Sequence, residues 1–256
     1  MFDLSCLIKN KCKSIHNIKS SSFYQFIESD LVSRLEPLDK TYGSILYVDL
    51  GFFRATEPST SHLKLDLIGN NPTIKFTNTD DLHHIQKKSM DLIYFPFGLH
   101  WIANMQEFLF SICSILKEDG VFICNFAGAG SLNNLRKTIF LAEEQAGSPH
   151  FPHIIPFIRF DDTTELLKRA GFNENITDFE NIELEYKSPI ELMRALKNYG
   201  ESNVLASRTN YSLTKKTYQM LVNSGNCPFF DQINLITLIS SPTKNSIRLK
   251  STYFFK

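Results

Sequence analysis

Hydrophobic positions along the first third of the chain predict one helix followed by three strands. Residues 21–35 place apolar side chains at positions 23, 26, 27, 31, 32 and 35, which is helical spacing. Apolar or alternating runs at 44–50, 62–67 and 73–76 predict strands. Only turn residues separate the last two strands, whereas parallel strands need a crossover of about a dozen residues. These two strands are therefore expected to be short or to pair as a hairpin.

From residue 90 onward, strand and helix spacing alternate. The predicted elements are, in order, a strand at 90–97, a helix at 104–116, a turn at 117–120, a strand at 121–126, a helix at 131–146, a proline-rich loop at 147–156, helices at 165–170, 189–200 and 211–222, and a strand at 231–239. Capping boxes that begin at Asp162 and Ser188 mark two of the helix starts, and Gly171 closes the first of these helices.

The alternation predicts an α/β fold built as a single domain over 1–256. It would have an N-terminal helical segment at 1–40 and an α/β core at 41–256 with helical additions at about 186–222. Pro58 and its polar neighbours predict that residues 52–72 lack a full crossover helix, because proline breaks a helix interior. The lysine-rich start of the chain is predicted to be a basic, mostly solvated helix.

Composition narrows the classes of partner and compartment. Lys+Arg and Asp+Glu both number 27, and the resulting zero net charge argues against nucleic-acid binding, which favours a basic excess. The five cysteines are odd in number and scattered, which favours a reducing, cytoplasmic compartment. No apolar run is long enough to predict a membrane span, and no continuous apolar stretch near the start predicts a secretory signal.

Polar residues follow several of the predicted strands, where an α/β sheet binds its ligand. The candidates are Asp49 and Gly51, Asp66, Asp80 or Asp81, and the segment 98–101 with His100. Each has a structural alternative: Asp66 as a solvent-facing strand residue, Asp80 and Asp81 as a helix cap, and His100 as a core histidine. His150 and His153 share a loop with no cysteine or acidic third ligand, so no metal site is predicted.

Several motifs together resemble the class I S-adenosylmethionine-dependent methyltransferases. The first of them are Asp49-Leu50-Gly51, Leu99-His100-Trp101 and the segment 119–122. Further motifs at 128–132, 166–172, 192–193 and 200–208 resemble one branch of that superfamily. This branch holds the malonyl-carrier-protein O-methyltransferases and the methyltransferase-like assembly factors of respiratory complex I, and the Gly-Glu-Ser-Asn segment at 200–203 is more similar to the assembly-factor side.

The resemblance implies a Rossmann-like fold whose mostly parallel sheet ends in an antiparallel strand at 231–239. It also implies S-adenosylmethionine as cofactor, with Gly51 beside the methionine part, Asp66 on the ribose hydroxyls and Asp81 with Leu82 near the adenine. The implied cofactor-binding set is Asp49, Gly51, Asp66, Asp81, Leu82, Leu99 and His100. A substrate or partner surface is expected around 128–132 and at Arg136, Glu201, Asn203 and Arg208. The alternative for Arg136 and Arg208 is an ordinary helix-face ion pair.

The glycine loop after the first strand departs from the family pattern. Phe53 and Ala55 stand where the pattern has glycines, and a bulky side chain in a close-packed site costs ~1–3 kcal/mol. That cost corresponds to roughly 5- to 150-fold in affinity. We therefore predict weak or absent S-adenosylmethionine binding, with Phe52 or Phe53 occupying space that the methionine end needs.

Three functions are compatible with the sequence. The first is an S-adenosylmethionine-dependent methyltransferase-like protein that acts on a protein or an acyl-carrier-type group. The alternative is a degenerate, non-catalytic member that serves as a binding or assembly factor for a respiratory-complex subunit. A modification other than methylation, proposed for relatives on the assembly-factor side, is a third. The sequence assigns neither the methyl acceptor nor catalytic residues.

Overall fold

The computed structural model describes residues 2–49, 63–66, 74–75, 79–208, 213–223 and 228–250. The strands in these residues form one sheet with the order β3-β2-β1-β4-β5-β7-β6. They are β1 (Ile45–Asp49), β2 (Leu63–Asp66), β3 (Ile74–Lys75), β4 (Met90–Phe95), β5 (Leu116–Ala127), β6 (Glu174–Tyr186) and β7 (Phe229–Ser241). Strands β1 to β5 pair in parallel, and β7 is antiparallel to both β5 and β6. The mostly parallel α/β sheet with an antiparallel last strand is thus confirmed.

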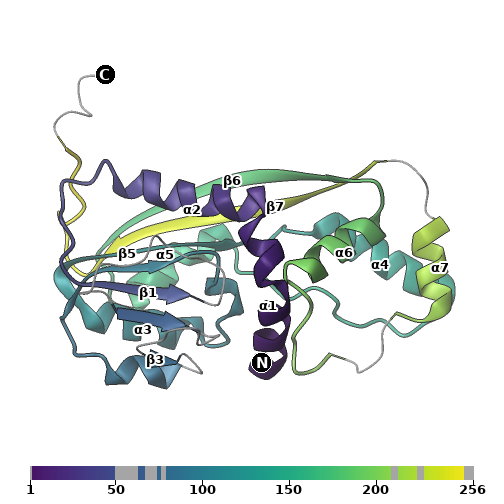
Figure 1. The fold of residues 1–256 in the computed structure, drawn as a ribbon, viewed down its shortest axis with the longest axis horizontal. Coiled ribbons are helices and arrows are strands. Elements are labelled where there is room, and N and C mark those ends of the chain that lie inside the picture. The colour runs from purple at the N-terminus through teal and green to yellow at the C-terminus, as the bar shows by residue number, and fades with distance from the viewer. Residues whose placement is uncertain are drawn as a thin grey trace.

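The helices form two groups around this sheet. They are α1 (Leu4–Lys19), α2 (Ser22–Leu35), α3 (Met105–Ile115), α4 (Asn133–Ala146), α5 (Phe160–Arg169), α6 (Pro189–Asn198) and α7 (Lys215–Asn223), with short 3-10 helices η1 (Thr79–His84) and η2 (Leu99–Trp101). Figure 1 shows α1 between the parallel strands on one side and α4, α6 and α7 on the other, while β6 and β7 run long across both parts.

Alternation along β4 shows why the central strands are apolar throughout. Leu92 and Tyr94 belong to the buried cluster on the face that α2 covers, whereas Ile93 and Phe95 belong to the cluster on the opposite face. All four side chains are almost fully buried. Helices on both faces of a parallel sheet require this nearly continuous hydrophobic run, so the prediction of a strand from residue 90 is confirmed.

The sequence analysis missed β6, the longest pairing partner in the sheet. It pairs with β7 over thirteen residue pairs, from Glu174 with Ser241 to Tyr186 with Phe229. Its one sequence signal is the alternation of Ile182, Leu184 and Tyr186 with glutamates. Acidic residues depress strand propensity, and this outweighs the signal where only one face of the strand is buried.

Of the two alternatives for the second and third strands, short strands are confirmed and the hairpin is excluded, because β2 and β3 form a short parallel pair with Leu65 beside Ile74. The predicted turn at 117–120 is wrong, because these residues belong to β5. A Cβ at Gly120 would lie 2.8 Å from the carbonyl oxygen of Met90, so this glycine permits a close approach of strands where their register shifts.

Helix starts were predicted with mixed success. At α6, Ser188 Oγ accepts a hydrogen bond from the Glu191 amide at 3.2 Å, which confirms that capping box. At α5 the box at Asp162 is wrong, because the helix already begins at Phe160 and no side chain caps it. Helix α4 is capped from another element: Asp231 of β7 accepts the amides of Asn134 and Leu135 at 3.3 and 2.7 Å.

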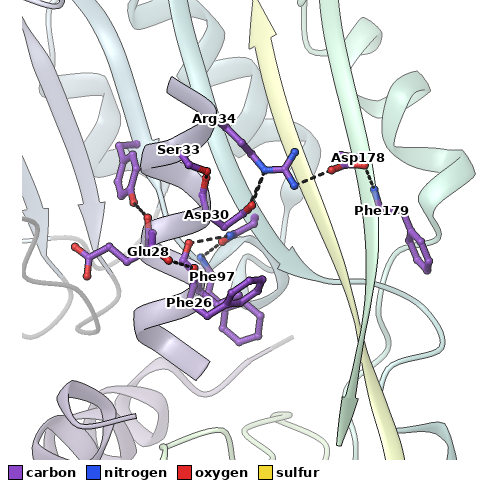
Figure 2. A network of polar contacts seen from close by, with 12 residues as sticks. Phe26, Glu28, Asp30, Ser33, Arg34, Phe97, Asp178 and Phe179 are labelled. Atoms are coloured by element: carbon purple, nitrogen blue, oxygen red, sulfur yellow. Dashed lines mark hydrogen bonds and ion pairs between the residues drawn. The ribbon is translucent and has the colours of Figure 1, made fainter. Parts of the chain in front are cut away.

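Polar contacts join α2 to β6 and the segment after β4 to β5. Figure 2 shows Arg34 of α2 between Asp30 of the same helix and Asp178 of β6. Arg34 Nε lies 2.9 Å from Asp30 Oδ2, and Arg34 Nη2 lies 2.7 Å from Asp178 Oδ2. On the fully buried Asn125 of β5, Oδ1 accepts the Phe97 amide at 2.8 Å and Nδ2 donates to the Ile27 carbonyl at 3.5 Å. The chain beyond β4 is therefore anchored to β5 and to α2 at once.

Candidate functional site

A cavity of about 770 Å³ opens where β4 and β5 end. Its walls come from α2, α4, α6, η2, the loop after α4 and the far part of β6. Most of the lining is apolar, and representative residues are Phe23, Phe97, Leu132, Leu135, Ile139, Ile154, Phe157, Ile182, Leu184, Leu192, Met193 and Leu196. Such a mostly apolar hollow with few polar groups is typical of a binding site for a small group or side chain.

The polar end of the cavity is organised around Glu201. Glu201 Oε1 accepts hydrogen bonds from Lys11 Nζ and, at 2.7 Å, from the Tyr24 hydroxyl. The other carboxylate oxygen, Oε2, accepts from Trp101 Nε1 at 3.1 Å and lies 3.8 Å from His100 Nε2. Side chains from three elements, α1, α2 and η2, therefore hold one carboxylate in place.

Burial and charge set the protonation of the ion pair of Lys11 and Glu201. The Lys11 side chain is fully buried, and this burial lowers its pKa to about 8 despite the carboxylate beside it. Burial raises the pKa of Glu201, but the charge of Lys11 and the contact with His100 outweigh that effect and bring it to about 2. The carboxylate is consequently ionised at neutral pH and is a hydrogen-bond acceptor rather than a strong base.

His100 joins this cluster as a neutral ring. Burial lowers its pKa, more than the neighbouring Glu201 raises it. The Ala127 amide points at His100 Nδ1 at 3.5 Å, which leaves the ring proton on Nε2, the nitrogen that faces Glu201. The histidine is therefore both a buried residue and part of the cavity lining, so the two alternatives considered for it describe the same position.

The proposed cofactor residues share one edge of the sheet where the structure describes them. Asp49 and Asp66 are paired in register at the ends of β1 and β2. Leu82 in η1 and Leu99 in η2 are fully buried. Gly51, Phe52, Phe53 and the proposed gap in helix over 52–72 lie outside the described residues, apart from β2, and so do the side chains of Asp49, Asp66 and Asp81. The cofactor assignment therefore stays a prediction.

The proposed substrate or partner residues make contacts within the chain. Arg136 donates to the carbonyl oxygens of Ile154 and Ile155 at 3.1 and 3.2 Å and thereby holds the loop after α4. Asn203 lines the cavity and donates to the Pro152 carbonyl at 2.6 Å. Arg208 forms an ion pair with Asp3 at 2.7 Å. Of the four predicted residues, Glu201 and Asn203 contribute to the cavity lining.

The glycine turn at 128–132 supports the structure from behind the cavity. Ser131 Oγ donates to the Gly128 carbonyl at 2.7 Å and accepts the Asn234 amide at 2.9 Å. Asn234 Nδ2 in turn donates to the Ala129 carbonyl at 2.7 Å. These bonds fasten the turn to β7, and Leu132 at its end lines the cavity.

Sequence reasoning missed Lys11 and Tyr24. The prediction of a mostly solvated first helix is wrong along one face of α1, where Leu7, Lys11, Ser14 and Ile18 are buried together. A lysine in phase with Leu7 and Ile18 was the available signal, since a charge on the apolar face of a helix needs a partner.

The loop after α4 contains a second polar cluster. Buried Glu143 lies 2.6 Å from His153 Nε2 and 3.5 Å from His150 Nδ1. The two histidines therefore do have an acidic neighbour, which the sequence analysis did not identify because it is on the preceding helix. Within the residues that the structure describes, no group of three or more side chains is arranged to hold a metal ion.

Comparisons with known proteins agree with this architecture. The chain is 48% identical over 190 residues to a protein named as a methyltransferase from Rickettsia prowazekii, covering 74% of this chain and 83% of that protein. It is 35% identical over 167 residues to the mitochondrial arginine-hydroxylase NDUFAF5 of Mus musculus, covering 65% and 46%. A malonyl-[acyl-carrier protein] O-methyltransferase of Coxiella burnetii is 23% identical over 193 residues, covering 75% and 62%. No family model matches the chain.

Among solved structures, the YcgJ protein of Bacillus subtilis superposes with a TM-score of 0.54 at 10% identity, over 85% of this chain and 100% of that one. BH2331 of Bacillus halodurans, described as a methyltransferase, gives 0.50 at 13% identity, over 84% and 98%. The fold is thus the Rossmann-like fold of class I methyltransferases. The sequence relatives identify the family within this fold.

The chain belongs to the S-adenosylmethionine-dependent methyltransferase-like family, in the branch that includes NDUFAF5 and the malonyl-[acyl-carrier protein] O-methyltransferases. It spans less than half the length of the mouse NDUFAF5 protein. None of the helices in the described residues has the length and apolar character needed to cross a membrane.

Proposed function

We propose that this chain is an S-adenosylmethionine-dependent methyltransferase-like enzyme whose acceptor is a protein side chain or a group carried by a protein. The observation that carries the proposal is the cavity at the ends of β4 and β5, apolar along its walls and closed by an ionised carboxylate. Two relatives are named for a group on an acyl-carrier protein, and five others for the hydroxylation of arginine. These names support a carrier-bound group or an arginine side chain as the acceptor.

The cofactor would occupy the neighbouring edge of the sheet. Asp49 and Asp66 end the adjacent strands β1 and β2, at the edge of the sheet where folds of this kind bind a nucleotide. Buried Leu82 and Leu99 would supply apolar contacts on the same edge. The positions of these residues support S-adenosylmethionine as the cofactor, which would supply an electrophilic methyl group. His100 follows β4 and lines the cavity, so it would stand between cofactor and acceptor.

Glu201 would position the acceptor. A carboxylate has about four lone-pair positions, and three donors already occupy Glu201 in the structure. With 12% of its side chain exposed, it retains access for one further donor from the acceptor. Because its pKa is about 2, Glu201 would orient and bind this group without taking its proton.

Titration with S-adenosylmethionine and its demethylated product by calorimetry tests the proposal. Micromolar binding supports the enzyme, whereas absent binding in the original chain, gained on Phe53→Gly, supports a degenerate site on a retained fold. Phe110→Ala is the control, since it removes an exposed aromatic ring from α3, outside the glycine loop in sequence. The degenerate binding factor is the second candidate because Phe53 and Ala55 replace glycines.

Mass spectrometry of offered acceptors separates the chemistries. Malonyl-[acyl-carrier protein] and arginine-containing peptides would be incubated with the chain and S-adenosylmethionine. A mass increase of one methyl group supports the proposal, and an increase of one oxygen atom supports hydroxylation instead. No product despite cofactor binding, with both acceptor classes bound, would favour an assembly role.

The remaining parts of the proposal concern organisation and compartment. We infer a single domain over 1–256 that works in the cytoplasm without a nucleic-acid partner. The described cysteines, Cys6, Cys12, Cys113 and Cys124, are all free thiols, in keeping with a reducing compartment. Fractionation of the source cells with an antibody to the chain tests the compartment.

A further inference from the structure

Strand β6 presents a long backbone edge that nothing in the described residues covers. It is the last strand of the sheet, and all of its strand pairing goes to β7 on one side. No backbone hydrogen bond between its outer edge and another described segment exists. Unpaired strand edges bind other extended chains unless they are blocked by proline, bulges, covering elements or charged side chains. Strand β6 has no proline and keeps an unbroken register over thirteen pairs, so its acidic side chains decide which chains the edge can accept.

This edge is continuous with the candidate site. Residues 182–186, the last part of β6, form one wall of the cavity. Ile182, Leu184 and Tyr186 are half-buried toward the core, while Glu183 and Glu185 alternate with them and are exposed. A chain that extends the sheet along this segment would run beside the cavity and send every second side chain to the cavity's side of the sheet.

Charge identifies the occupant. Strand β6 carries five acidic residues and no basic one. Glu174 accepts the amides of Ser246 and Ile247, and Asp178 pairs with Arg34. Within the described part of the chain, the other three, Glu180, Glu183 and Glu185, form no ion pair or side-chain hydrogen bond. A second copy of β6 would bring like charges opposite each other, which is destabilising, whereas basic side chains would be favourable.

Exposed apolar side chains on the same strand supply the remaining contact area. Ile176 and Phe179 are 47% and 45% exposed. Exposed apolar side chains on an edge strand gain nothing from contact with water. They would pack against a partner strand in which apolar and basic side chains alternate.

We propose that β6 is a docking edge for an extended, basic segment of the protein acceptor. This segment adds to the sheet as an extra strand and thereby places the group that is to be modified in the cavity. This inference rests on the proposed function, since it specifies how a protein acceptor binds the same site. Backbone hydrogen bonds along β6 provide affinity, and the acidic side chains select basic sequences. The acceptor is thus an unstructured or terminal segment rather than a folded surface.

A synthetic peptide of alternating lysine and valine, about as long as β6, is the probe. Fluorescence anisotropy measures its binding to the full chain, and hydrogen exchange locates the contact. We expect the peptide to bind and to protect amides of β6, and a glutamate–valine peptide of the same length to remain unbound. The double variant Glu183→Lys with Glu185→Lys should weaken binding by about tenfold or more, because two opposite-charge pairs become like-charge pairs.

Two controls separate strand addition from general attraction between charges. Glu144→Lys changes an exposed acid on α4 and should leave peptide affinity unchanged. A lysine–valine peptide with every backbone amide N-methylated keeps its charge but has no backbone donors, so it should lose binding. Circular dichroism verifies that each variant is folded.

The proposal is overturned if the lysine–valine peptide does not bind at low salt, if protection falls outside β6, or if the N-methylated peptide binds equally well. In the first case the acids of β6 serve edge protection alone. The assay contains no S-adenosylmethionine and measures no turnover, so a failed cofactor titration and a failed docking assay are separate results.

Discussion

The two edges of the sheet differ in how much structure each one pairs. At one edge, β2 and β3 pair through two residues each, and β1 pairs with β2 over four. At the other edge, β6 and β7 pair over thirteen. The short edge carries the implied cofactor residues, and the long edge carries a wall of the cavity. The part of the molecule that would bind the acceptor is thus more extensively built than the part that would bind the cofactor.

Hydrogen exchange should show the largest contrast between the short edge, formed by β2 and β3, and the interior strands β5 and β7 next to β6. We expect amides of β5 and β7 to exchange a thousandfold or more slowly than those of β2 and β3, because short edge strands open locally while central strands exchange through global unfolding. Native-state exchange followed by NMR measures this. Equal protection of these two pairs of strands would contradict the expected difference in stability. Increased protection of β2 on adding S-adenosylmethionine would show that the cofactor stabilises the short edge.

Removing the carboxylate of Glu201 should cost about 3–5 kcal/mol of unfolding free energy, because Glu201→Ala leaves the buried Lys11 ammonium without its ion-pair partner. Urea unfolding measures the loss. Glu201→Gln keeps the shape and a hydrogen-bond acceptor and should cost less, and adding Lys11→Met to Glu201→Ala should recover part of the stability. If the alanine variant were as stable as the original chain, the cluster around Glu201 would not contribute to holding α1, α2 and η2 together.

Acid should destabilise the chain through the same residue. The pKa of Glu201 is about 2 in the folded chain, against an ordinary 4.5, so the folded state binds fewer protons than the unfolded state between these values. Its contribution, roughly 2–3 kcal/mol, is present above pH ~4.5 and lost as the pH falls toward ~2. Urea unfolding across this pH range gives the unfolding free energy of the original chain and of Glu201→Gln, and the difference between them isolates the contribution of Glu201. A difference that does not change with pH would contradict this prediction.

The smallest expected effect concerns the loop after α4. Arg136→Met should cost roughly 1–3 kcal/mol, because the carbonyl groups of buried Ile154 and Ile155 lose their donors. Arg208→Met is the matched control, since it breaks a more exposed ion pair with Asp3 and should cost less. Thermal unfolding ranks the two variants. The reverse order would show that Arg208, rather than Arg136, supports the cavity.

The sequence was sufficient for elements whose signals are local. The apolar run of β4, the capping box at Ser188 and the alternation of β7 each predicted an element that the structure contains. It was insufficient wherever the deciding partner is remote. Gly120 resembles a turn residue until the strand beside it is known, and the helix α4 is capped by Asp231 from β7. Strand β6 carries too many acids to stand out, because its stabilisation comes from β7.

The candidate site shows the same division. Glu201 and His100 were identified through motifs, but Lys11 and Tyr24, which complete the cluster, are on helices whose own sequences indicate ordinary amphipathic elements. Periodicity along one helix specifies which face is buried, not what that face meets. Conversely, Arg136 and Arg208 lie in segments that match the family, but both make contacts within the chain. Arg136 donates to backbone carbonyl groups, and Arg208 forms an ion pair with Asp3.

The pairing of Lys11 with Glu201 also orders events during synthesis. The two residues are 190 positions apart, and ribosomes add about 5–20 residues per second. Helix α1 would therefore wait about 10–40 seconds for the Glu201 carboxylate that pairs with its buried lysine. During that interval its apolar face has no complete docking site and is open to non-native contacts in the nascent chain.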